Sequence, residues 1–465
     1  MKKLSFLALC LGIIGATPSL RAQFSISPLT TFAGGNGWFA PGEAGYPYLT
    51  TGNTERGLAY GNGHLYLVSR ANVNGNAVNV RILDALTGSD LGALDTSGIS
   101  GGLFVVDMVA VGGDGAIYVN NLTSQSTTTP FKVYKWATEG STPTVAYSGD
   151  GGLAGARVGD SVAIIGAGSS TRLALGYNIN SAVAGNNGYA IVDPTAGTAT
   201  AVGFSGTPPN AGDFQAGITF SDSSHVLGTA GSLYRYTSFS GSAGTLLASP
   251  SLSTSAERLT AYAVVGGVPL LAVQNTVSST VRIYDLTDPV HPILRGTANN
   301  TSGSLTSNFD TGELAWGDIQ GNTAHLWAMS SNQGIQAFRV IVPATQGIAW
   351  RTIDGGGGTS TNSTLAITGT IGQPDAGKLS GNTLAIDGGF WGVIAVQTPG
   401  APTLTIAAAA PGEAAISWSP NTPGFRLQES DTVSPANWTD SPSGTANPVT
   451  VAVSAPKKFY RLFKP

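Results

Sequence analysis

Four short stretches of alternating apolar and polar residues open the body of the chain: Arg56-Gly57-Leu58-Ala59-Tyr60, His64-Leu65-Tyr66-Leu67-Val68-Ser69-Arg70, Val78-Asn79-Val80-Arg81-Ile82-Leu83-Asp84 and Leu91-Gly92-Ala93-Leu94-Asp95. Such alternation is typical of β-strands that bury one face, and the Gly, Asn, Asp and Ser residues between the stretches favour turns. No stretch keeps a helical spacing of apolar residues over three turns. We therefore predict four consecutive β-strands over residues 56–95.

The same four-strand pattern recurs along the chain. Its second copy lies at residues 107–111, 116–120, 131–136 and 143–147. Later copies begin near Asp160, Gln215, Glu257 and Asp310. When Ala59, Ala110, Ala163, Thr219, Ala261 and Ala315 are taken as equivalent positions, successive copies are 51, 53, 56, 42 and 54 residues apart. The chain is therefore predicted to contain six structural repeats.

The repeat length predicts a β-propeller, because four strands in roughly 50 residues form one blade, a small sheet that buries both faces against its neighbours. We expect an all-β protein in which residues 23–345 form a six-bladed ring. The last copy reaches Pro343 without an obvious fourth strand, and residues 24–32 precede the first copy without a partner of their own. We predict that this segment pairs with residues 335–342, which would remove two open sheet edges at once.

A turn that contains Asp and Gly follows the third strand of two copies, as Asp84-Ala85-Leu86-Thr87-Gly88 and Asp193-Pro194-Thr195-Ala196-Gly197. Asp can accept hydrogen bonds from its own turn, and Gly tolerates positive φ. With these turns, residues 24–345 resemble the Asp-x-x-Thr-Gly-containing propellers of secreted bacterial proteins, a propeller-like domain of unknown function. The resemblance implies the fold and leaves the activity open, because propellers host binding, scaffolding and catalysis alike.

The first 22 residues predict export. Met1-Lys2-Lys3 precede an apolar run at residues 4–14, and small residues lead to a cleavage site after Ala22, as in a secretory signal peptide. A lipoprotein signal at Cys10 is the weaker alternative, because Leu9 precedes Cys10 and the apolar run continues past it. Removal of residues 1–22 takes away the only cysteine, so neither disulfides nor cysteine-ligated zinc would be available. We expect a secreted protein, located outside the cell, at its surface or in the periplasm.

Composition limits the partners. The chain has 22 Lys and Arg against 26 Asp and Glu, and its formal net charge of −4 becomes −7 when Lys2, Lys3 and Arg21 are removed with the signal peptide. A negative charge without a basic run argues against nucleic acid as a partner. No later stretch reaches the roughly 18 apolar residues of a membrane helix. We expect a monomer without a transmembrane segment, whose partner is an extracellular carbohydrate or protein.

The C-terminal part is predicted to hold two further β regions. In the glycine-rich residues 346–397, the stretches 363–367 and 382–386 look like strands of one small sheet, and the region resembles the stretch that precedes C-terminal modules in other exported bacterial proteins. A short stiff linker follows at residues 398–402. Residues 403–465 resemble a fibronectin type III-like β-sandwich, shortened because a complete sandwich has about 100 residues. That resemblance implies an adhesion, spacer or sorting module.

Candidate binding residues lie where the first strands of the repeats start and the second strands end, because these positions meet on one face of a propeller around its central channel. They are Glu55, Arg56, Asp107, Asp160, Glu257 and Arg258 at first-strand starts, and Asn121, Asn178 and Asn275 at second-strand ends. Carboxylates and amides offer the donors and acceptors that neutral sugars or polar peptides require. Trp38, in an aromatic loop at residues 38–48, would add an exposed ring for sugar stacking.

A structural role for the same residues is the alternative. The Glu55-Arg56 and Glu257-Arg258 pairs would then tie adjacent blades, and the aromatic loop would fill the channel by packing. Neighbouring residues on a strand point to opposite sides. One member of each pair should therefore face the channel, while the other contacts an adjoining blade or loop.

No metal, cofactor or catalytic site is predicted. His64, His225 and His325 all stand at the start of a second strand, which favours a packing role over metal binding, and His291 has no apparent partner. Residues 98–102 match the nucleophile-elbow pattern Gly-x-Ser-x-Gly but lack the helix on which that motif depends.

The sequence favours an extracellular or surface-associated binding or scaffold protein with one polar propeller face. The alternative is a polysaccharide-acting enzyme of the glycosidase or lyase type, with Asp107, Asp160, Glu55 or Glu257 as acid and base. Two carboxyls across an open cleft, one with a raised pKa, would favour the enzyme. Acids neutralised by arginine around a narrow channel would favour the scaffold.

Overall fold

The chain is described from a computed structural model, which covers residues 24–179, 183–252, 257–302, 311–343, 356–361, 366–371, 378–380, 385–387, 401–410, 412–432, 437–453 and 457–464. Across these residues the protein is all-β, with only three short 3-10 turns, η1 (Ala33–Gly35), η2 (Glu43–Gly45) and η3 (Gly168–Ser170). None of the helical segments in these ranges has the length and apolar character needed to cross a membrane. The expected signal peptide and Asp310 lie outside the described residues.

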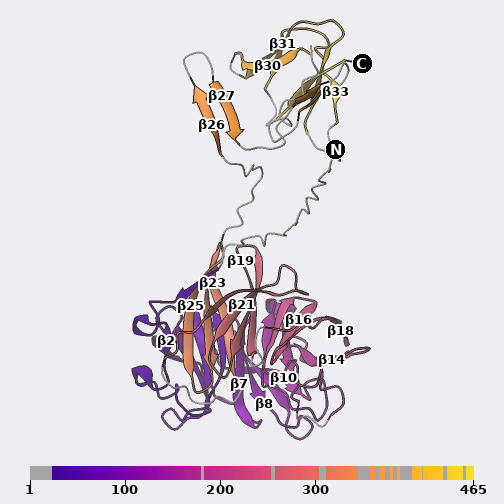
Figure 1. Cartoon of the computed structure of the whole chain (residues 1–465). Coiled ribbons are helices and arrows are strands. Elements are labelled where there is room, and N and C mark those ends of the chain that lie inside the picture. Colours follow the sequence, from indigo (N-terminus) through magenta and orange to yellow (C-terminus); the bar gives the residue numbers. More distant parts are fainter. Residues whose placement is uncertain are drawn as a thin grey trace, which may run out of the picture. The chain divides into compact units, whose positions relative to one another are not determined.

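The chain divides into two compact units, Met1–Thr345 and Gln346–Pro465 (Figure 1). Most strands of the first unit form consecutive sets of four, which we call quartets 1 to 5. Quartet 1 holds β3 (Glu55–Gly61), β4 (His64–Ser69), β5 (Asn79–Asp84) and β6 (Asp90–Ala93), and quartet 2 holds β7 (Phe104–Val111), β8 (Ile117–Leu122), β9 (Phe131–Trp136) and β10 (Thr144–Gly149). Quartet 3 holds β11 (Ala163–Ile165), β12 (Arg172–Gly176), β13 (Tyr189–Asp193) and β14 (Thr198–Phe204), and quartet 4 holds β15 (Ile218–Asp222), β16 (His225–Ala230), β17 (Leu233–Ser240) and β18 (Ala243–Ala248). Quartet 5 holds β19 (Glu257–Val265), β20 (Val268–Asn275), β21 (Val281–Asp285) and β22 (Ile293–Ala298).

Each quartet is an antiparallel meander in which every strand pairs with the next along the chain. The alternating apolar residues set the register, as in quartet 1, where Leu58 lies opposite Leu67 and Leu67 opposite Arg81. Quartets 1, 2 and 5 are separate four-stranded sheets. Quartets 3 and 4 are joined by parallel pairing of β14 with β18 into one eight-stranded sheet. Its two end strands, β11 and β15, contact each other, so this sheet is nearly closed and barrel-like.

The first strand of each quartet contacts the first strand of the next. β3 contacts β7, β7 contacts β11, β11 contacts β15, and β15 contacts β19; β19 then contacts β23 (Gly312–Gln320), which returns to β3. A central cavity of about 190 Å³ lies between these six strands. The six positions that were aligned in the sequence all line this cavity: Ala59, Ala110, Ala163, Thr219, Ala261 and Ala315. Small side chains at these positions let the six strands approach one another.

The quartets pack face to face, which gives sandwich-like layers between neighbouring sheets. The cluster between quartets 1 and 2, for example, contains Tyr66, Val68, Val119 and Trp136, all completely or almost completely buried. Burial of apolar area of this kind is the main favourable term in folding, at about 25 cal/mol per Å². Each sheet thus depends on its neighbours for the burial of its faces.

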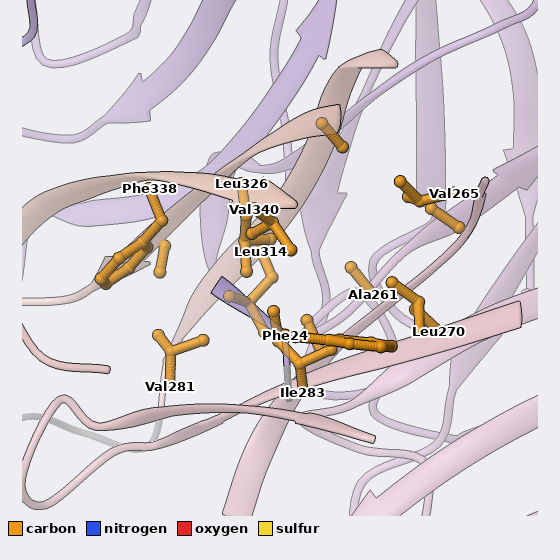
Figure 2. Close-up of a cluster of buried hydrophobic side chains, with 14 of the residues drawn as sticks. Phe24, Ala261, Val265, Leu270, Val281, Ile283, Leu314, Leu326, Phe338 and Val340 are labelled. Atoms are coloured by element: carbon orange, nitrogen blue, oxygen red, sulfur yellow. The ribbon is translucent and has the colours of Figure 1, made fainter. Parts of the chain in front are cut away.

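A further sheet follows quartets 1 to 5 and is completed by the N-terminal segment; we call it the sixth sheet because five quartets precede it. β23, β24 (Thr323–Ser330) and β25 (Gly334–Ile341) are followed by β1 (Ser25–Pro28), which pairs antiparallel with β25, and β2 (Trp38–Phe39) also pairs with β25. Figure 2 shows Phe24 among side chains from quartet 5 and the sixth sheet, including Ile283 and Leu314. The predicted pairing of the N-terminal segment with residues 335–342 is confirmed.

The second unit contains short strands in four sheets. β26 (Gly356–Thr361) pairs with β27 (Ala366–Ile371), and β28 (Lys378–Ser380) pairs with β29 (Ala385–Asp387). The other two sheets are β30 (Thr403–Ala408), β31 (Glu413–Ser419) and β34 (Val449–Ala452), and β33 (Thr439–Asp440), β32 (Arg426–Ser430) and β35 (Phe459–Phe463). The expectation that the strands near residues 366 and 385 share one sheet is wrong, because each closes a separate hairpin.

The core of residues 403–464 is small. Ile416, Trp418 and Leu427 are its buried members, and partly buried residues such as Tyr460 and Leu462 pack against them. The two three-stranded sheets of this region thus share one cluster of apolar side chains. Among the described residues, this cluster has fewer buried members than each of the clusters in the first unit.

Candidate functional site

A polar cavity of about 220 Å³ lies where the first strands begin, and we call this the cavity end of the first unit. It is lined by Asn53, Arg56, Phe104, Arg157, Asp160, Gln215, Ala216 and Thr311. Arg56 and Phe104 belong to the first residues of β3 and β7, whereas Asp160, Gln215 and Thr311 lie within three residues before β11, β15 and β23. The candidate residues Arg56 and Asp160 therefore lie on one cavity, although they come from different quartets.

Arg56 connects three sheets at this cavity. Its Nε and Nη2 donate to the two carboxylate oxygens of Asp107 on β7, at 2.6 and 3.4 Å, and its Nη1 donates to Thr311 Oγ1 at 3.1 Å. The side chains of Arg56 and Asp107 are 4% and 0% exposed. Burial raises the pKa of Asp107 to about 6, although the Arg56 guanidinium opposes this shift. Asp107 is thus a buried, arginine-paired acid and does not itself line the polar cavity.

Asp160 accepts hydrogen bonds from two sides. Arg157 donates from Nε to Oδ2 at 2.9 Å and from Nη2 to Oδ1 at 2.7 Å, and Asn178 Nδ2 donates to Oδ2 at 3.0 Å. Arg56 Nη2 lies 3.9 Å from Oδ1 of the same carboxylate. Two candidate residues, Asp160 and Asn178, are therefore in direct contact. Arg157 was missed by the sequence reasoning, and its position three residues before Asp160 is the signal that could have found it.

A third arginine borders the cavity through Phe104. The Arg70 guanidinium lies over the Phe104 ring, 3.3 Å from its centroid, and the Arg56 guanidinium lies 5.0 Å from the same centroid. Arg70 also donates from Nη1 to the Asn53 carbonyl at 3.4 Å. Burial, with a further contribution from the Arg56 charge, lowers the pKa of Arg70 below its usual range. The guanidinium groups of Arg56, Arg70 and Arg157 thus lie close to the carboxylates of Asp107 and Asp160 at this end of the first strands.

Glu55 and Arg56 have different surroundings. Glu55 is completely buried and accepts hydrogen bonds from the Thr50 and Asn332 backbone N–H groups and from the Thr54 hydroxyl. Burial raises its pKa, with these hydrogen bonds acting in the opposite direction. Arg56 faces the polar cavity, whereas Glu55 contacts the preceding loop and the sixth sheet. The predicted division of this pair holds only in part, because Arg56 lies on the polar cavity and not on the central one, and it also contacts the neighbouring sheet through Asp107.

The second Glu-Arg pair is not part of the polar cavity lining. Glu257 is completely buried and forms an ion pair with Arg282 of β21 in its own quartet. Arg258 is half-buried, and its carbonyl oxygen accepts a hydrogen bond from the Thr229 hydroxyl at 2.7 Å. The equivalent sequence positions in quartets 1 and 5 therefore hold different sets of contacts.

Asn121 and Asn275 stabilise turns. Asn121 is completely buried, donates to the Pro130 carbonyl and accepts from the Lys132 N–H, which ties β8 to β9. The Asn275 side-chain oxygen accepts from the backbone N–H groups of Val277 and Ser278, in the turn after β20. These amides satisfy backbone groups of the protein itself.

The aromatic loop at residues 38–48 is largely packed into the core. Trp38 is 8% exposed and donates its indole N–H to the Gln333 carbonyl at 2.9 Å, while Phe39 packs edge-on against Phe32. Tyr46 stacks on the buried Tyr48. The expectation of an exposed Trp38 ring for sugar stacking is wrong, because pairing of β2 with β25 places this ring under the sixth sheet.

Glu313 is an acid that the candidate set omitted. It lies on β23, lines the central cavity and accepts a hydrogen bond at Oε2 from the Leu58 N–H at 3.1 Å. Burial, together with the negative charge of Asp107, raises its pKa well above the usual value. The signal was an isolated acid inside the apolar string of a first strand, Gly312-Glu313-Leu314-Ala315-Trp316.

Each histidine lies beside a carboxylate. The Nδ1 atoms of His64, His225, His291 and His325 lie 2.6, 2.9, 2.8 and 3.2 Å from Glu139, Asp222, Asp288 and Asp318, respectively. The expectation that His291 has no partner is wrong, because the turn at residues 288–291 brings it back onto Asp288. Within the described ranges, no cluster of three or more His, Cys, Asp or Glu side chains is arranged to hold a metal ion.

Comparison with known proteins finds similarity to a family of unknown function over part of the chain. Residues 17–244 match the family model of a domain of unknown function, DUF4623. A solved structure of a DUF4623 family protein from Bacteroides eggerthii is similar at 17% sequence identity and a TM-score of 0.48, over 63% of this chain and 72% of that chain. No curated protein matches the sequence.

Proposed function

We propose that this chain is an exported binding or scaffold protein, in which the first unit is a six-bladed β-propeller that presents the polar cavity to an extracellular carbohydrate or peptide. Five quartets and the sixth sheet, with a circuit of contacts among six first strands around one cavity, support the propeller. In this proposal β14 and β18 are the outer strands of two neighbouring blades, linked by a short parallel pairing. Residues 403–465 would serve as a fibronectin type III-like spacer or adhesion module.

The pairing of Asp107 and Asp160 with arginine is the observation that carries the functional proposal. Asp107 is held by Arg56, and Asp160 is held by Arg157 and Asn178. A general acid or a nucleophile must reach the substrate with a carboxyl group. Asp107 has no exposed surface, and both oxygens of Asp160 already accept hydrogen bonds from cations or amides. The arrangement suits recognition better than bond cleavage.

An enzyme acting on polysaccharide is the second candidate, favoured by one observation. The pKa of Asp107 is raised to about 6, which is the range of a general acid, and Asp160 is close enough for its negative charge to contribute to that shift. Incubation of the full exported chain with soluble polysaccharides, followed by measurement of new reducing ends or unsaturated products, tests this candidate. Product formation that is lost in the Asp107→Asn variant would replace the binding proposal.

A binding screen tests the first candidate. The full exported chain is applied to a glycan array and to a random peptide library, and retained ligands are measured again with the Gln215→Ala variant, which changes the cavity lining without removing an ion pair. We expect retention of at least one class and a loss of affinity of about tenfold in the variant, because one hydrogen-bonding side chain is removed. Retention of nothing, or equal retention by the variant, contradicts a binding role for this cavity.

The closure of the ring has its own test. Removal of residues 24–32 takes away the buried side chains of Phe24, Leu29 and Phe32. Burial of each of these side chains stabilises the folded protein by about 2 kcal/mol. We expect the melting temperature of the chain to fall by roughly 10 °C. An unchanged melting temperature would mean that the segment is a tail and that the sixth sheet does not need it.

A further inference from the structure

We infer that the central cavity binds a primary ammonium group on a short alkyl chain, with Glu313 as its counter-ion. This cavity has a different lining from the polar cavity, so the inference does not depend on the proposed function. Among the described residues that line it, only Glu313 carries a charged side chain. The lining therefore holds one acid and no cation.

Glu313 has no cationic partner within the described part of the chain. No Lys, Arg or His side chain lies within ion-pair distance of its carboxylate, and the Arg56 guanidinium is bonded to Asp107. The backbone N–H groups of Leu58 and Val109 act on the Glu313 carboxylate, but they carry no full charge. A buried carboxylate without a cation is unfavourable, and a bound ammonium group would supply the missing charge.

Glu313 is also accessible to a ligand. Asp107 and Glu55 are completely buried, whereas Glu313 keeps part of its surface accessible and lines the central cavity. An ionised carboxylate has about four acceptor positions. The two backbone N–H groups therefore leave acceptor capacity on Glu313 for a donor inside the cavity.

Thr260 is a second, independent sign of a ligand. It lines the same cavity and is 7% exposed, yet its hydroxyl oxygen has no hydrogen-bond partner among the described residues. Buried hydroxyl groups without a partner are uncommon in proteins. Thr260 lies on β19 and Glu313 on β23, which contact each other, and in the repeat alignment the two positions differ by one residue. A ligand with several N–H donors could therefore bond to both.

The rest of the lining favours an organic cation over a metal ion. Ca²⁺ requires roughly six to eight oxygen ligands, whereas the cavity offers a single carboxylate in a lining that is mostly alanine and aliphatic residues. An ammonium group has three donors for carboxylate and hydroxyl oxygens. Its alkyl chain would be buried against the aliphatic wall. Aromatic rings, which attract cations, complete the lining: Tyr60, Tyr262 and Trp316.

The volume of the cavity limits the length of the alkyl chain. About 190 Å³ holds roughly six groups of the size of a water molecule, at about 30 Å³ each. An aminobutyl chain is of this size. Such a chain occurs in free alkylamines and at the end of a lysine side chain.

Calorimetric titration of the full exported chain with n-butylammonium chloride tests this inference. The matched ligands are n-butanol, which has the chain without the charge, and tetramethylammonium, which has the charge without an N–H donor. We expect n-butylammonium to bind at least about tenfold more tightly than either. Sodium and potassium chloride control for ionic strength and for binding of a metal ion. Equal binding of Nα-acetyl-lysinamide identifies a lysine side chain as the ligand, and weaker binding identifies a free amine.

Two variants and one control locate the site. Glu313→Gln removes the charge and keeps an oxygen for the Leu58 N–H, and it should lose about tenfold or more in affinity. Thr260→Val removes a hydroxyl that has no partner, so it should fold as the parent does and lose roughly fivefold. Glu139→Gln changes an acid that pairs with His64 outside the cavity lining, and it should bind as the parent does.

Three results would overturn the inference. The first is no binding of n-butylammonium, and the second is equal binding of n-butanol, tetramethylammonium, sodium or potassium ions. The third is equal binding by Glu313→Gln or, if that variant does not fold, by Thr260→Val. None of these results bears on the polar cavity, so the proposed function is tested separately.

Discussion

Carboxyl groups at the two ends of the first strands have pKa values shifted in opposite directions. At the cavity end, burial raises the pKa of Asp107 to about 6 and that of Glu313 well above its usual value. At the opposite end, which we call the turn end, burial also acts on Asp114 and Asp222, but hydrogen bonds outweigh it and lower the pKa; Asp114 accepts from the Gly168 N–H of the neighbouring quartet, and Asp222 accepts from His225 and Ser224 of its own turn. Ionisation of a carboxyl group is therefore disfavoured by folding at the cavity end and favoured by folding at the turn end.

The difference comes from what surrounds the charge. Asp107 and Arg56 are removed from water, so the energy of their attraction is offset by the cost of dehydrating two ions. Asp222 keeps 53% of its side chain in solvent while it accepts hydrogen bonds from Ser224. Local turn geometry stabilises the charged form there at little dehydration cost. Loss of one partner of a buried ion pair at the cavity end should consequently lower the free energy of unfolding more than loss of one partner of an exposed ion pair.

The largest effect is expected for Arg56→Ala. This change leaves Asp107 buried without its cation, and we expect the free energy of unfolding at pH 7 to fall by about 3–5 kcal/mol. Urea denaturation monitored by fluorescence measures it. The matched control is Arg172→Ala, whose pair with Asp193 is substantially exposed and should contribute less than about 1 kcal/mol. Equal effects of the two variants would contradict the inference that burial makes the Arg56–Asp107 pair more important for stability than the exposed pair.

A pH-dependent effect is expected for Asp107. Since its pKa is raised in the folded state, the folded protein holds the proton more tightly than the unfolded chain, and stability contributed by this group falls as pH rises from about 4 to 6. A shift from 3.8 to about 6 corresponds to about 3 kcal/mol. Chemical denaturation at pH 4, 5, 6 and 7 should show this fall in the parent and a flatter profile in Asp107→Asn. A parallel profile in the variant would assign the titration to another group.

The smallest effect is expected for Asp222→Asn, and its sign is opposite. The folded pKa of Asp222 is depressed, so its ionised form stabilises the protein above the unfolded pKa near 4, and this contribution disappears as pH falls below that value. Because the side chain is half exposed, the loss at pH 7 should stay within about 1 kcal/mol. Denaturation at pH 7 and at pH 3 should separate the variant from the parent only at pH 7. A larger difference at pH 3 would contradict the assigned sign.

Sequence reasoning located the strand positions that line the central cavity, but it did not find the partners of the polar side chains. Ala59 and Ala315 were aligned from alternation alone, and both line the central cavity. The N-terminal strand was expected from an unpaired edge, and it pairs with β25. The partner of Arg56 was not predictable, because Asp107 is 51 residues away in the sequence and only the packing of β3 beside β7 brings the two together. Trp38 was wrongly expected to be exposed for a related reason, because a strand of two residues is too short for its alternation to predict that it pairs with β25.

The sequence by itself determined the all-β class, the alternating strands and the polar residues at the first-strand starts, because alternation and turn chemistry are local properties of the chain. Only the tertiary structure decided which of those residues share a cavity and which stabilise turns. It also decided that acids at the two ends titrate in opposite directions. The burial of a charged group sets its dehydration cost, and the distance between charged groups of different quartets sets their attraction. Both depend on how the sheets pack, so they cannot be read from the sequence.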